Sequence, residues 1–403
     1  MAPPRLAETN LFKPITVGSV TLQNRLVFAP TSRFRMNDDH SPTNLVKHYY
    51  EARSETNGGL IVVEGAFVSP QAGFFWNSPM IYTDKQVEAW KQIADSIHSK
   101  GSSVSLQIYH RGRVGDPKIL KENGLPLLGP SALYLDEESE KAAIAAGNPL
   151  RSFTVPEIKQ LITEFKEAAI KSIKLAGFDF VEIHVGYMYT LAQFVDVATN
   201  QRTDEYGGSI EKRSKLVLEI VDEVVAAVGA EHVGIRVSPY IKFQGGSGGD
   251  SKLMHPIAQY AYLFSELERR GREGKRLGYL HIVESKVADG VDVKDGPEYS
   301  SEWIAQIWKG VLIRAGGYLH QPDYFNLIKD VNGDDRTLIG ASRYYTSNPD
   351  LAHRLKNGLE LTPYDRDTFY TPGNYGYNTF GKVGEPQFGR DSAIAKEEAV
   401  SLV

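Results

Sequence analysis

Cysteine is absent from this chain of 403 residues. Its absence excludes disulfide bonds, thiolate metal sites, cysteine-bound iron–sulfur clusters and a cysteine nucleophile. The metal-binding motif HExxH is absent as well, and it is the pattern by which one large class of zinc hydrolases is recognised. We therefore predict no metal centre, and we expect a cytoplasmic enzyme.

Neither sign of charge is in large excess. The chain carries 45 basic and 50 acidic residues, which give a formal net charge of −5. This balance creates no strong field for nucleic acid or for an anionic membrane. No apolar run approaches the roughly 18 residues that a membrane-spanning helix needs, and the first segment, MAPPRLAETNLFKP, lacks the apolar core of a secretory signal. We expect a small molecule as the partner, with no nucleic acid and no membrane.

Short apolar runs bounded by turn residues recur along the chain. Most are rich in Val, Ile and Leu over five or more residues, as expected of strands that are buried on both faces. There are eight such runs, at Arg25–Pro30, Gly59–Val68, Ser103–Tyr109, Phe178–Val185, Val233–Pro239, Tyr279–Glu284, Val311–Gly317 and Arg336–Arg343.

Stretches with helical spacing lie between these runs. The clearest are Thr83–Lys100, Pro156–Leu175 and Ser209–Val228, where apolar residues recur every three or four positions. Thr154 followed by Glu157 is typical of a capping box at a helix start. Eight alternations of strand and helix favour an α/β fold of the (β/α)8 (TIM) barrel type over an open doubly wound sheet.

Two connections are longer than ordinary loops of such a barrel. They are Arg111–Phe153, after the third strand, and Glu284–Trp303, after the sixth. The segment Ile241–Met254 contains GGSGGDS, which predicts a flexible loop without a packed core. We predict that residues 1–403 form a single domain, with a barrel over about residues 12–360 and a tail, 361–403, wrapping it.

Polar residues gather where the predicted strands end, which is where barrels of this type place their active site. The last two runs end in glycines and an arginine, the usual phosphate site of the fold, since glycine admits close backbone approach and arginine supplies charge. This pattern predicts a phosphorylated cofactor. Glu64 and Glu284 are the only acids at strand ends, so a glycosidase with paired carboxylates is poorly supported.

Several segments resemble the Old Yellow Enzyme family of flavin-dependent ene-reductases, most closely its yeast and fungal members. They include LFKPITVGSVTLQNRLVFAPTSRFR, LQIYHRGRVGDP, NQRTDEYGGSIEKRS, SRYYTSNPDL and YDRDTFYTP, and they extend from residue 11 to residue 372. The resemblance implies a (β/α)8 barrel that binds FMN without a covalent bond, is reduced by NADPH, and occurs as a monomer or homodimer.

The resemblance also implies which residues bind the cofactor. Ser32 would hydrogen-bond near flavin O4, Gln107 would bind the pyrimidine edge, and Arg236 would lie near N1 and O2, where its charge stabilises the anionic reduced flavin. The flavin would also be lined by Pro30 and Thr31 and covered by Phe369 and Tyr370, and the phosphate would be held by Gly316, Gly317, Ser342 and Arg343.

The catalytic residues are implied by the stretch VEIHVGYMYT. In the family this strand ends His-x-x-(Asn or His)-Gly-Tyr. The histidine and the Asn or His bind the substrate carbonyl, hydride from flavin N5 adds to the β-carbon, and the tyrosine protonates the α-carbon. His184 and Tyr189 match these places, whereas Tyr187 stands where Asn or His is usual and Met188 replaces the glycine.

Tyr187 leaves more than one function open. Its phenol can still donate a hydrogen bond, but it either narrows the pocket or turns away, which would leave His184 as the main donor to the carbonyl. The first hypothesis is NADPH-driven reduction of the C=C bond of enones or enals. The alternatives are a diverged flavin barrel with an altered reaction, such as an isomerase, a desaturase or a specialised biosynthetic step, and a flavin-binding protein with low turnover.

Overall fold

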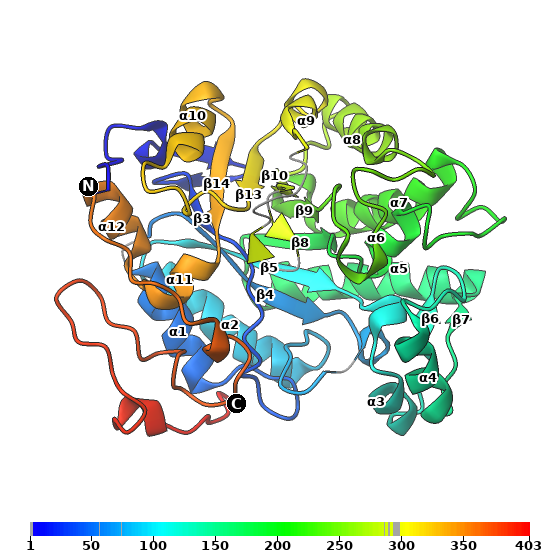
Figure 1. The fold of residues 1–403 in the computed structure, drawn as a ribbon, viewed down its shortest axis with the longest axis horizontal. Helices are drawn as coiled ribbons and strands as arrows, with labels where there is room; N and C mark the ends of the chain where they lie inside the picture. The colour runs from blue at the N-terminus through cyan, green and yellow to red at the C-terminus, as the bar shows by residue number, and fades with distance from the viewer. Residues whose placement is uncertain (1–2, 56, 74, 286, 289–290, 293–298) are drawn as a thin grey trace.

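The structure is a computed structural model that describes residues 3–55, 57–73, 75–285, 287–288, 291–292 and 299–403. Its centre is a closed barrel of eight parallel strands (Figure 1). In order around the barrel these are β3 (Leu26–Phe28), β4 (Leu60–Phe67), β5 (Ser103–Tyr109), β8 (Phe180–Val185), β9 (Val233–Val237), β10 (Tyr279–Val283), β13 (Leu312–Ala315) and β14 (Thr337–Ala341). Each strand lies within one of the eight predicted runs, so the predicted barrel is confirmed and the open sheet is excluded.

The amino-terminal end of the barrel is closed by a hairpin. Its strands are β1 (Ile15–Val17) and β2 (Val20–Leu22), which pair in antiparallel fashion. The hairpin side chains Val17 and Leu22 pack with Phe180 and Tyr279 of the barrel in one buried apolar cluster. Because this end is filled with side chains, the opposite end, formed by the carboxyl ends of the strands, is where a ligand can enter.

Helices cover the outside of the barrel, and the three that the sequence predicted are present within a few residues of their expected bounds. They are α2 (Asp84–His98), α5 (Val155–Ile170) and α7 (Ile210–Val228). Thr154 and Glu157 form the predicted capping box, which satisfies backbone N–H groups at the start of the helix. The other long helices are α1 (Asn44–Ser54), α8 (Pro256–Arg272) and α10 (Phe325–Gly333), and the shorter ones on this layer are α9 (Glu302–Ile307), α11 (Arg343–Ser347) and α12 (Leu351–Asn357).

The predicted long connection after β5 is a small substructure with its own core. It contains α3 (Pro117–Glu122), α4 (Glu137–Ala145) and a pair of two-residue strands, β6 (Leu128–Gly129) and β7 (Arg151–Ser152). Four buried side chains hold it together, namely Leu120, Leu127, Ala143 and Leu150. The connection after β10 contains β11 (Val287–Ala288) and β12 (Val291–Asp292); residues 286, 289–290 and 293–298 of this predicted loop lie outside the described residues.

The segment 241–254 has more contacts than the predicted free loop would have. Ser247 donates from its backbone N and from Oγ to the carboxylate of Asp196, at 2.9 and 2.6 Å. The backbone oxygen of Gln244 accepts from Arg113 Nη2 at 2.9 Å, and Gln244 Nε2 donates to the backbone oxygen of Tyr187 at 2.8 Å. The prediction of a segment without packing was therefore wrong, because its glycines let the backbone approach polar anchors that sequence does not reveal.

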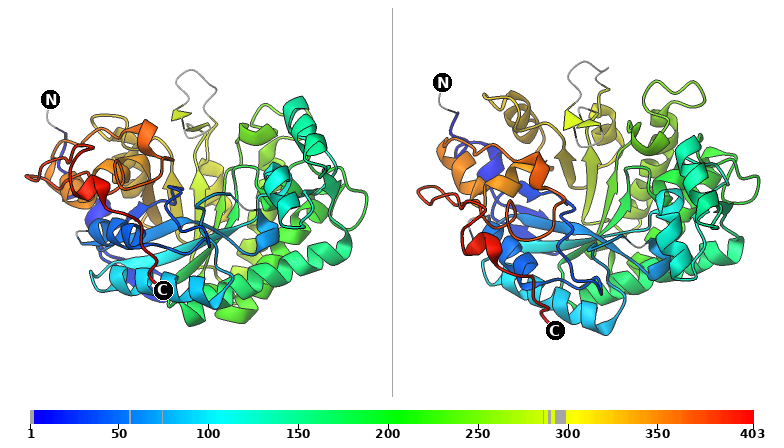
Figure 2. Two further views of the ribbon diagram at one scale, coloured as in Figure 1. Left: turned by 90° about the horizontal axis from the view of Figure 1, so that it is seen from below. Right: turned by 60° about the horizontal axis from the view of Figure 1, so that its bottom comes forward.

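The tail 361–403 lies along the N-terminal part of the chain. Figure 2 shows the tail in orange to red beside the blue N-terminal elements. Arg33 and Arg35 follow β3, are nearly fully buried, and donate to backbone oxygens of residues 368–376 at 2.7 to 3.1 Å. Near the end of the tail, Ser401 forms a backbone bridge with Thr43. These contacts support the proposal that residues 1–403 form a single domain. Within the described part of the chain, no helix combines the length and apolar character needed to cross a membrane.

Candidate active site

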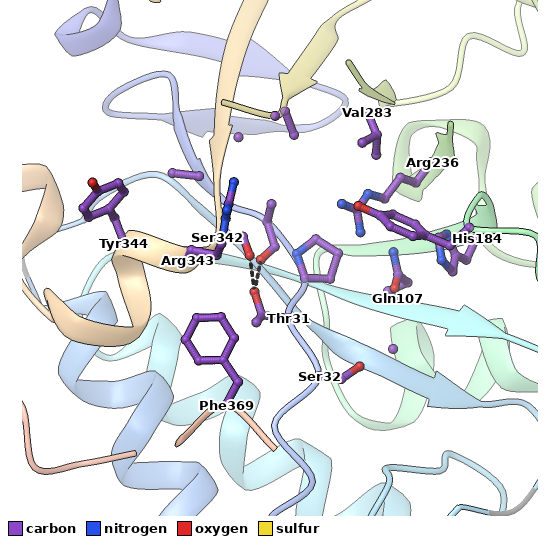
Figure 3. Close-up of a pocket in the computed structure, with 18 of the residues that line it drawn as sticks. Thr31, Ser32, Gln107, His184, Arg236, Val283, Ser342, Arg343, Tyr344 and Phe369 are labelled. Carbon is purple, nitrogen blue, oxygen red and sulfur yellow. Dashed lines mark hydrogen bonds between the residues drawn. The ribbon is translucent and has the colours of Figure 1, made fainter. Parts of the chain in front are cut away.

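A cavity of about 440 Å³ opens at the carboxyl ends of the barrel strands. Its volume lies in the range usual for cofactor and ligand sites. All fourteen residues predicted for the site line it: Pro30, Thr31, Ser32, Gln107, His184, Tyr187, Tyr189, Arg236, Gly316, Gly317, Ser342, Arg343, Phe369 and Tyr370. Figure 3 shows Gln107, His184 and Arg236 on one side of it and Thr31, Ser342 and Arg343 on the other.

The side formed by β13 and β14 suits an anionic group. Gly316 and Gly317 have φ values of 123° and 73°, and this left-handed backbone is readily adopted only by glycine. Next to them, Ser342 Oγ and Thr31 Oγ1 share a hydrogen bond of 2.7 Å. Arg343 lines the cavity here and donates from Nη1 to Tyr364 Oη at 3.2 Å. A guanidinium beside exposed backbone and hydroxyl groups is well suited to hold a phosphate.

The opposite side contains polar groups that the protein itself does not satisfy. Arg236 is 7% exposed, and its Nε has no hydrogen-bond partner in the described part of the chain. His184 is 4% exposed, and its Nδ1 likewise has no hydrogen-bond partner among the described residues. Buried polar atoms without partners are costly unless a ligand or water binds them. These residues, together with the anion-binding side of the cavity, would suit a flavin mononucleotide bound between them.

His184 is a neutral imidazole in this setting. Burial lowers its pKa well below the ordinary value, and the nearby positive charge of Arg236 lowers it further. A neutral imidazole carries one N–H, which can donate to a carbonyl oxygen without becoming an acid itself. His184 can therefore polarise a bound carbonyl over the whole neutral pH range.

Tyr189 keeps its phenolic proton. Burial raises its pKa above the ordinary value, although the charge of Arg111 acts in the opposite direction. Its ring lies 4.9 Å from that of Tyr109 and 5.4 Å from the His184 imidazole, measured between centroids. A protonated phenol next to a neutral histidine at one cavity wall is a reasonable pair of proton donor and carbonyl ligand.

The turn between these two residues has an unusual backbone. Tyr187 and Met188 both have left-handed φ angles, 51° and 55°, which cost energy for residues other than glycine. Hydrogen bonds hold the turn in place: Tyr187 N donates to Ser238 Oγ at 2.8 Å, and Gln193 Nε2 donates to Met188 O at 2.7 Å. The turn thus keeps the shape that glycine would adopt without strain.

Tyr187 lines the cavity instead of turning away from it. Its ring centroid lies 6.0 Å from that of His184, and the guanidinium carbon of Arg236 lies 5.5 Å from the Tyr187 ring centroid. Phe243, from the segment 241–254, meets the Tyr187 ring edge to face at 6.4 Å. Of the two positions open to Tyr187 in the sequence, the structure has the one that narrows the pocket.

Some lining residues were not singled out from the sequence. Tyr109 follows Gln107 by two positions on β5, so both face the same side of the strand, and this spacing could have revealed it. Phe34, Gly65 and Phe243 also line the cavity, but Phe243 comes from a loop and carries no periodic signal. The strand-end residue Glu284 does not line it, and instead accepts from Arg314 at 2.7 Å.

Glu64, which was predicted to lie at a strand end, lies within β4 and does not line the cavity. It is fully buried, and its Oε2 accepts from the backbone N of Arg33 at 3.0 Å. Burial raises the pKa of its carboxyl from 4.5 to about 7, although Arg33 and Arg35 act against this shift. Removing a carboxylate from water disfavours its charged form, and this explains the direction.

This raised pKa predicts a pH-dependent loss of stability. The folded protein binds the Glu64 proton more tightly than the unfolded chain, so the free energy of unfolding should fall as the pH rises from 4.5 to about 7. The contribution of this one group is about 3 kcal/mol. Urea unfolding of the parent and of Glu64→Gln at pH 5 and pH 8 isolates it: the variant should gain stability relative to the parent at the higher pH. An equal difference at both pH values would contradict the assignment.

The comparisons with known proteins agree with this geometry. Residues 10–362 match the NADH:flavin oxidoreductase / NADH oxidase family. A "Probable NADPH dehydrogenase" of Candida albicans is 43% identical over 393 residues, which are 96% of this chain and 95% of that protein. "Enoate reductase 1" of Kluyveromyces lactis is 40% identical over 381 residues, or 93% of this chain and 94% of that protein. The crystal structure of Old Yellow Enzyme from Pichia sp. AKU4542 has a TM-score of 0.94 and 54% identity, and covers 99% of this chain and 100% of that one.

A closed parallel barrel with this cavity, matched by these relatives over nearly its whole length, defines an oxidoreductase of the flavin-dependent, nicotinamide-using class. The chain belongs to the NADH:flavin oxidoreductase / NADH oxidase family, the family of Old Yellow Enzyme. The membership predicted from its motifs is confirmed.

Proposed function

We propose that the protein uses FMN and NADPH to reduce the C=C bond of α,β-unsaturated ketones or aldehydes. The observation that carries this proposal is the pairing of neutral His184 with protonated Tyr189 on one wall of the cavity that also contains Arg236 and Arg343. The family and the name of the enoate reductase that is 40% identical support the same reaction class.

The cavity residues have complementary roles toward the cofactor. Gly316, Gly317, Ser342 and Arg343 would hold the phosphate, and Gln107 and Arg236 would hold the pyrimidine edge, with Ser32 near O4. FMN held there would supply the hydride chemistry, with NADPH as the hydride source and the β-carbon of the substrate as the acceptor. Arg236 would stabilise the negative charge that builds up near N1 and O2 on reduction.

The reaction at the substrate is carried by two side chains. His184 donates a hydrogen bond to the carbonyl oxygen and draws electron density away from the conjugated alkene, so that the β-carbon becomes electrophilic. Tyr189 then gives its phenolic proton to the α-carbon. The rings of Tyr109, Tyr187 and Phe243 line the same cavity, and apolar surroundings strengthen polar interactions of this kind.

Substitution of Tyr187 tests whether the altered motif limits the rate. If Tyr187 crowds the pocket and does not bind the carbonyl, Tyr187→Asn should raise cyclohexenone turnover, by up to about 10²-fold if a full oxyanion donor is restored. Tyr187→Phe should then behave like the parent, because only the hydroxyl is lost. Steady-state assays of the three proteins decide: equal rates in all three would show that this position neither binds the carbonyl nor limits the reaction.

Visible absorbance distinguishes the proposed function from its alternatives. The purified protein should be yellow, should bleach with anaerobic NADPH, and should recover its colour when cyclohexenone is added. The strained Tyr187–Met188 turn favours one second candidate, a diverged reaction on a different unsaturated substrate, and such a protein would bleach without regaining colour with simple enones. A protein that holds no flavin, and cannot be reconstituted with FMN, would overturn both.

A further inference from the structure

Glu182 is a fully buried carboxylate beneath the floor of the cavity. It lies on β8, two residues before His184, and has no exposed surface. It does not line the cavity, so neither substrate nor cofactor would touch it. A buried carboxylate is costly to maintain unless it is well bonded.

Two side chains bond Glu182, one from β5, which pairs with β8, and one from β10, which lies beyond β9 on the other side. Gln107 Nε2 donates to Glu182 Oε1 at 2.7 Å, and His281 Nδ1 lies 2.8 Å from Glu182 Oε2. On neighbouring strands of the barrel, Gln107 of β5 is paired in register with Glu182 of β8. Arg236 of β9 is paired in register with His184 of β8 and with His281 of β10. Glu182 of β8 thus bonds side chains of β5 and β10, and Gln107, one of the two, lines the cavity.

The carboxylate of Glu182 is ionised. Burial alone would raise its pKa, but His281, Arg236 and Gln107 together hold the pKa below the ordinary value. His281 donates its Nδ1 proton to this carboxylate at 2.8 Å, although burial lowers the pKa of its own imidazole. An ionised carboxylate can only accept hydrogen bonds, and this fixes the direction of both contacts.

The orientation of the Gln107 amide follows from that direction. Its NH2 group must face Glu182, so its oxygen must face the other way. A Cβ atom on Gly65 would lie 2.9 Å from Gln107 Oε1, and Gly65 lines the cavity beside Gln107. Gln107 therefore presents a hydrogen-bond acceptor on the side of the cavity that also contains Arg236. That arrangement is complementary to an imide edge, in which an N–H stands next to a carbonyl oxygen.

We propose that Glu182 is a positioning residue: it holds the Gln107 oxygen toward the N3–H of FMN, and its negative charge offsets the charge of Arg236. This inference rests on the proposed binding of FMN. The first effect makes the site select an unsubstituted N3–H. The second opposes formation of the anionic reduced flavin, which Arg236 favours, so Glu182 lowers the reduction potential.

The substitution Glu182→Gln tests both effects with almost no change in volume. A glutamine can donate as well as accept, so the Gln107 amide is free to rotate, and the negative charge is gone. Apoprotein is titrated with FMN and with 3-methyl-FMN, which lacks the N3–H. The parent should prefer FMN, and the variant should lose about tenfold of this preference. The reduction potential of bound FMN should become more positive in the variant.

Two further variants make the result decisive. Glu64→Gln removes another fully buried carboxylate that does not contact Gln107, and it should keep the parental preference for FMN. Glu182→Asp keeps the charge but shortens the side chain, so it should lose the preference while its potential stays near that of the parent. If Glu182→Gln does not fold, the preference measured with Glu182→Asp decides alone.

The outcomes separate the inference from the function on which it rests. A parent protein that binds neither flavin would overturn the proposed function itself. A parent that prefers FMN, together with Glu182 variants that show the same preference and the same potential, would overturn the positioning role. If Glu182 had a purely structural role, its variants would have a changed melting temperature, but their preference for FMN and their reduction potential would be those of the parent.

Discussion

Tyr189→Phe should lower cyclohexenone turnover by about 10²–10⁴-fold, the range associated with loss of a positioned proton donor. The phenylalanine ring fills the same space against Tyr109 and His184, so only the transferable proton is removed. Reduction of the flavin by NADPH needs no proton from Tyr189 and should proceed at the parental rate. Stopped-flow absorbance follows the two half-reactions separately.

The pattern across the two half-reactions is what identifies a proton donor. Tyr260→Phe is a suitable control, because this tyrosine of α8 is also buried but does not line the cavity, and both half-reactions should stay within a few-fold of the parent. A Tyr189→Phe enzyme that reoxidises with cyclohexenone as fast as the parent would show that another group or water protonates the α-carbon.

Arg343→Ala should weaken FMN binding by about 10²-fold or more. The arginine lies at the β13–β14 side of the cavity with Gly316 and Gly317, and charge-assisted bonds from a guanidinium to phosphate are among the stronger polar contacts in proteins. Titration of apoprotein with FMN, followed by quenching of flavin fluorescence, gives the Kd directly.

Riboflavin, which lacks the phosphate, provides the control for Arg343. Its affinity should be nearly the same in the parent and in Arg343→Ala, because the lost contact is to the phosphate alone. Arg343→Lys keeps the charge but not the paired donors, so its affinity for FMN should be intermediate. An unchanged Kd for FMN in Arg343→Ala would place the phosphate elsewhere in the cavity.

The barrel could be predicted because its strands are buried on both faces and so read as continuous apolar runs. The residues at the strand ends could also be predicted to lie together, since parallel strands in a closed barrel end at one rim. Gln107, Arg236 and Arg343 are far apart in sequence, yet all three line one cavity.

Other parts depend on contacts that no local pattern reveals. The chain 111–153 forms a core from only four apolar side chains, which is too few for a periodic signal. The approach of Phe243 to Tyr187 depends on the anchors at Asp196 and Arg113. The raised pKa of Glu64 arises from burial, which sequence alone does not quantify.

Arg33 and Arg35 bind the tail through hydrogen bonds to its backbone. Their acceptors are the backbone oxygens of Thr368, Phe369, Gly373 and Gly376, which every amino acid provides alike. The exposed side chain of Tyr370 can therefore be exchanged without loosening these hydrogen bonds, whereas the buried ring of Phe369 also lies 5.5 Å from the guanidinium carbon of Arg33. In directed evolution, exposed side chains of this segment can be varied at the edge of the cavity while the backbone hydrogen bonds to Arg33 and Arg35 are kept.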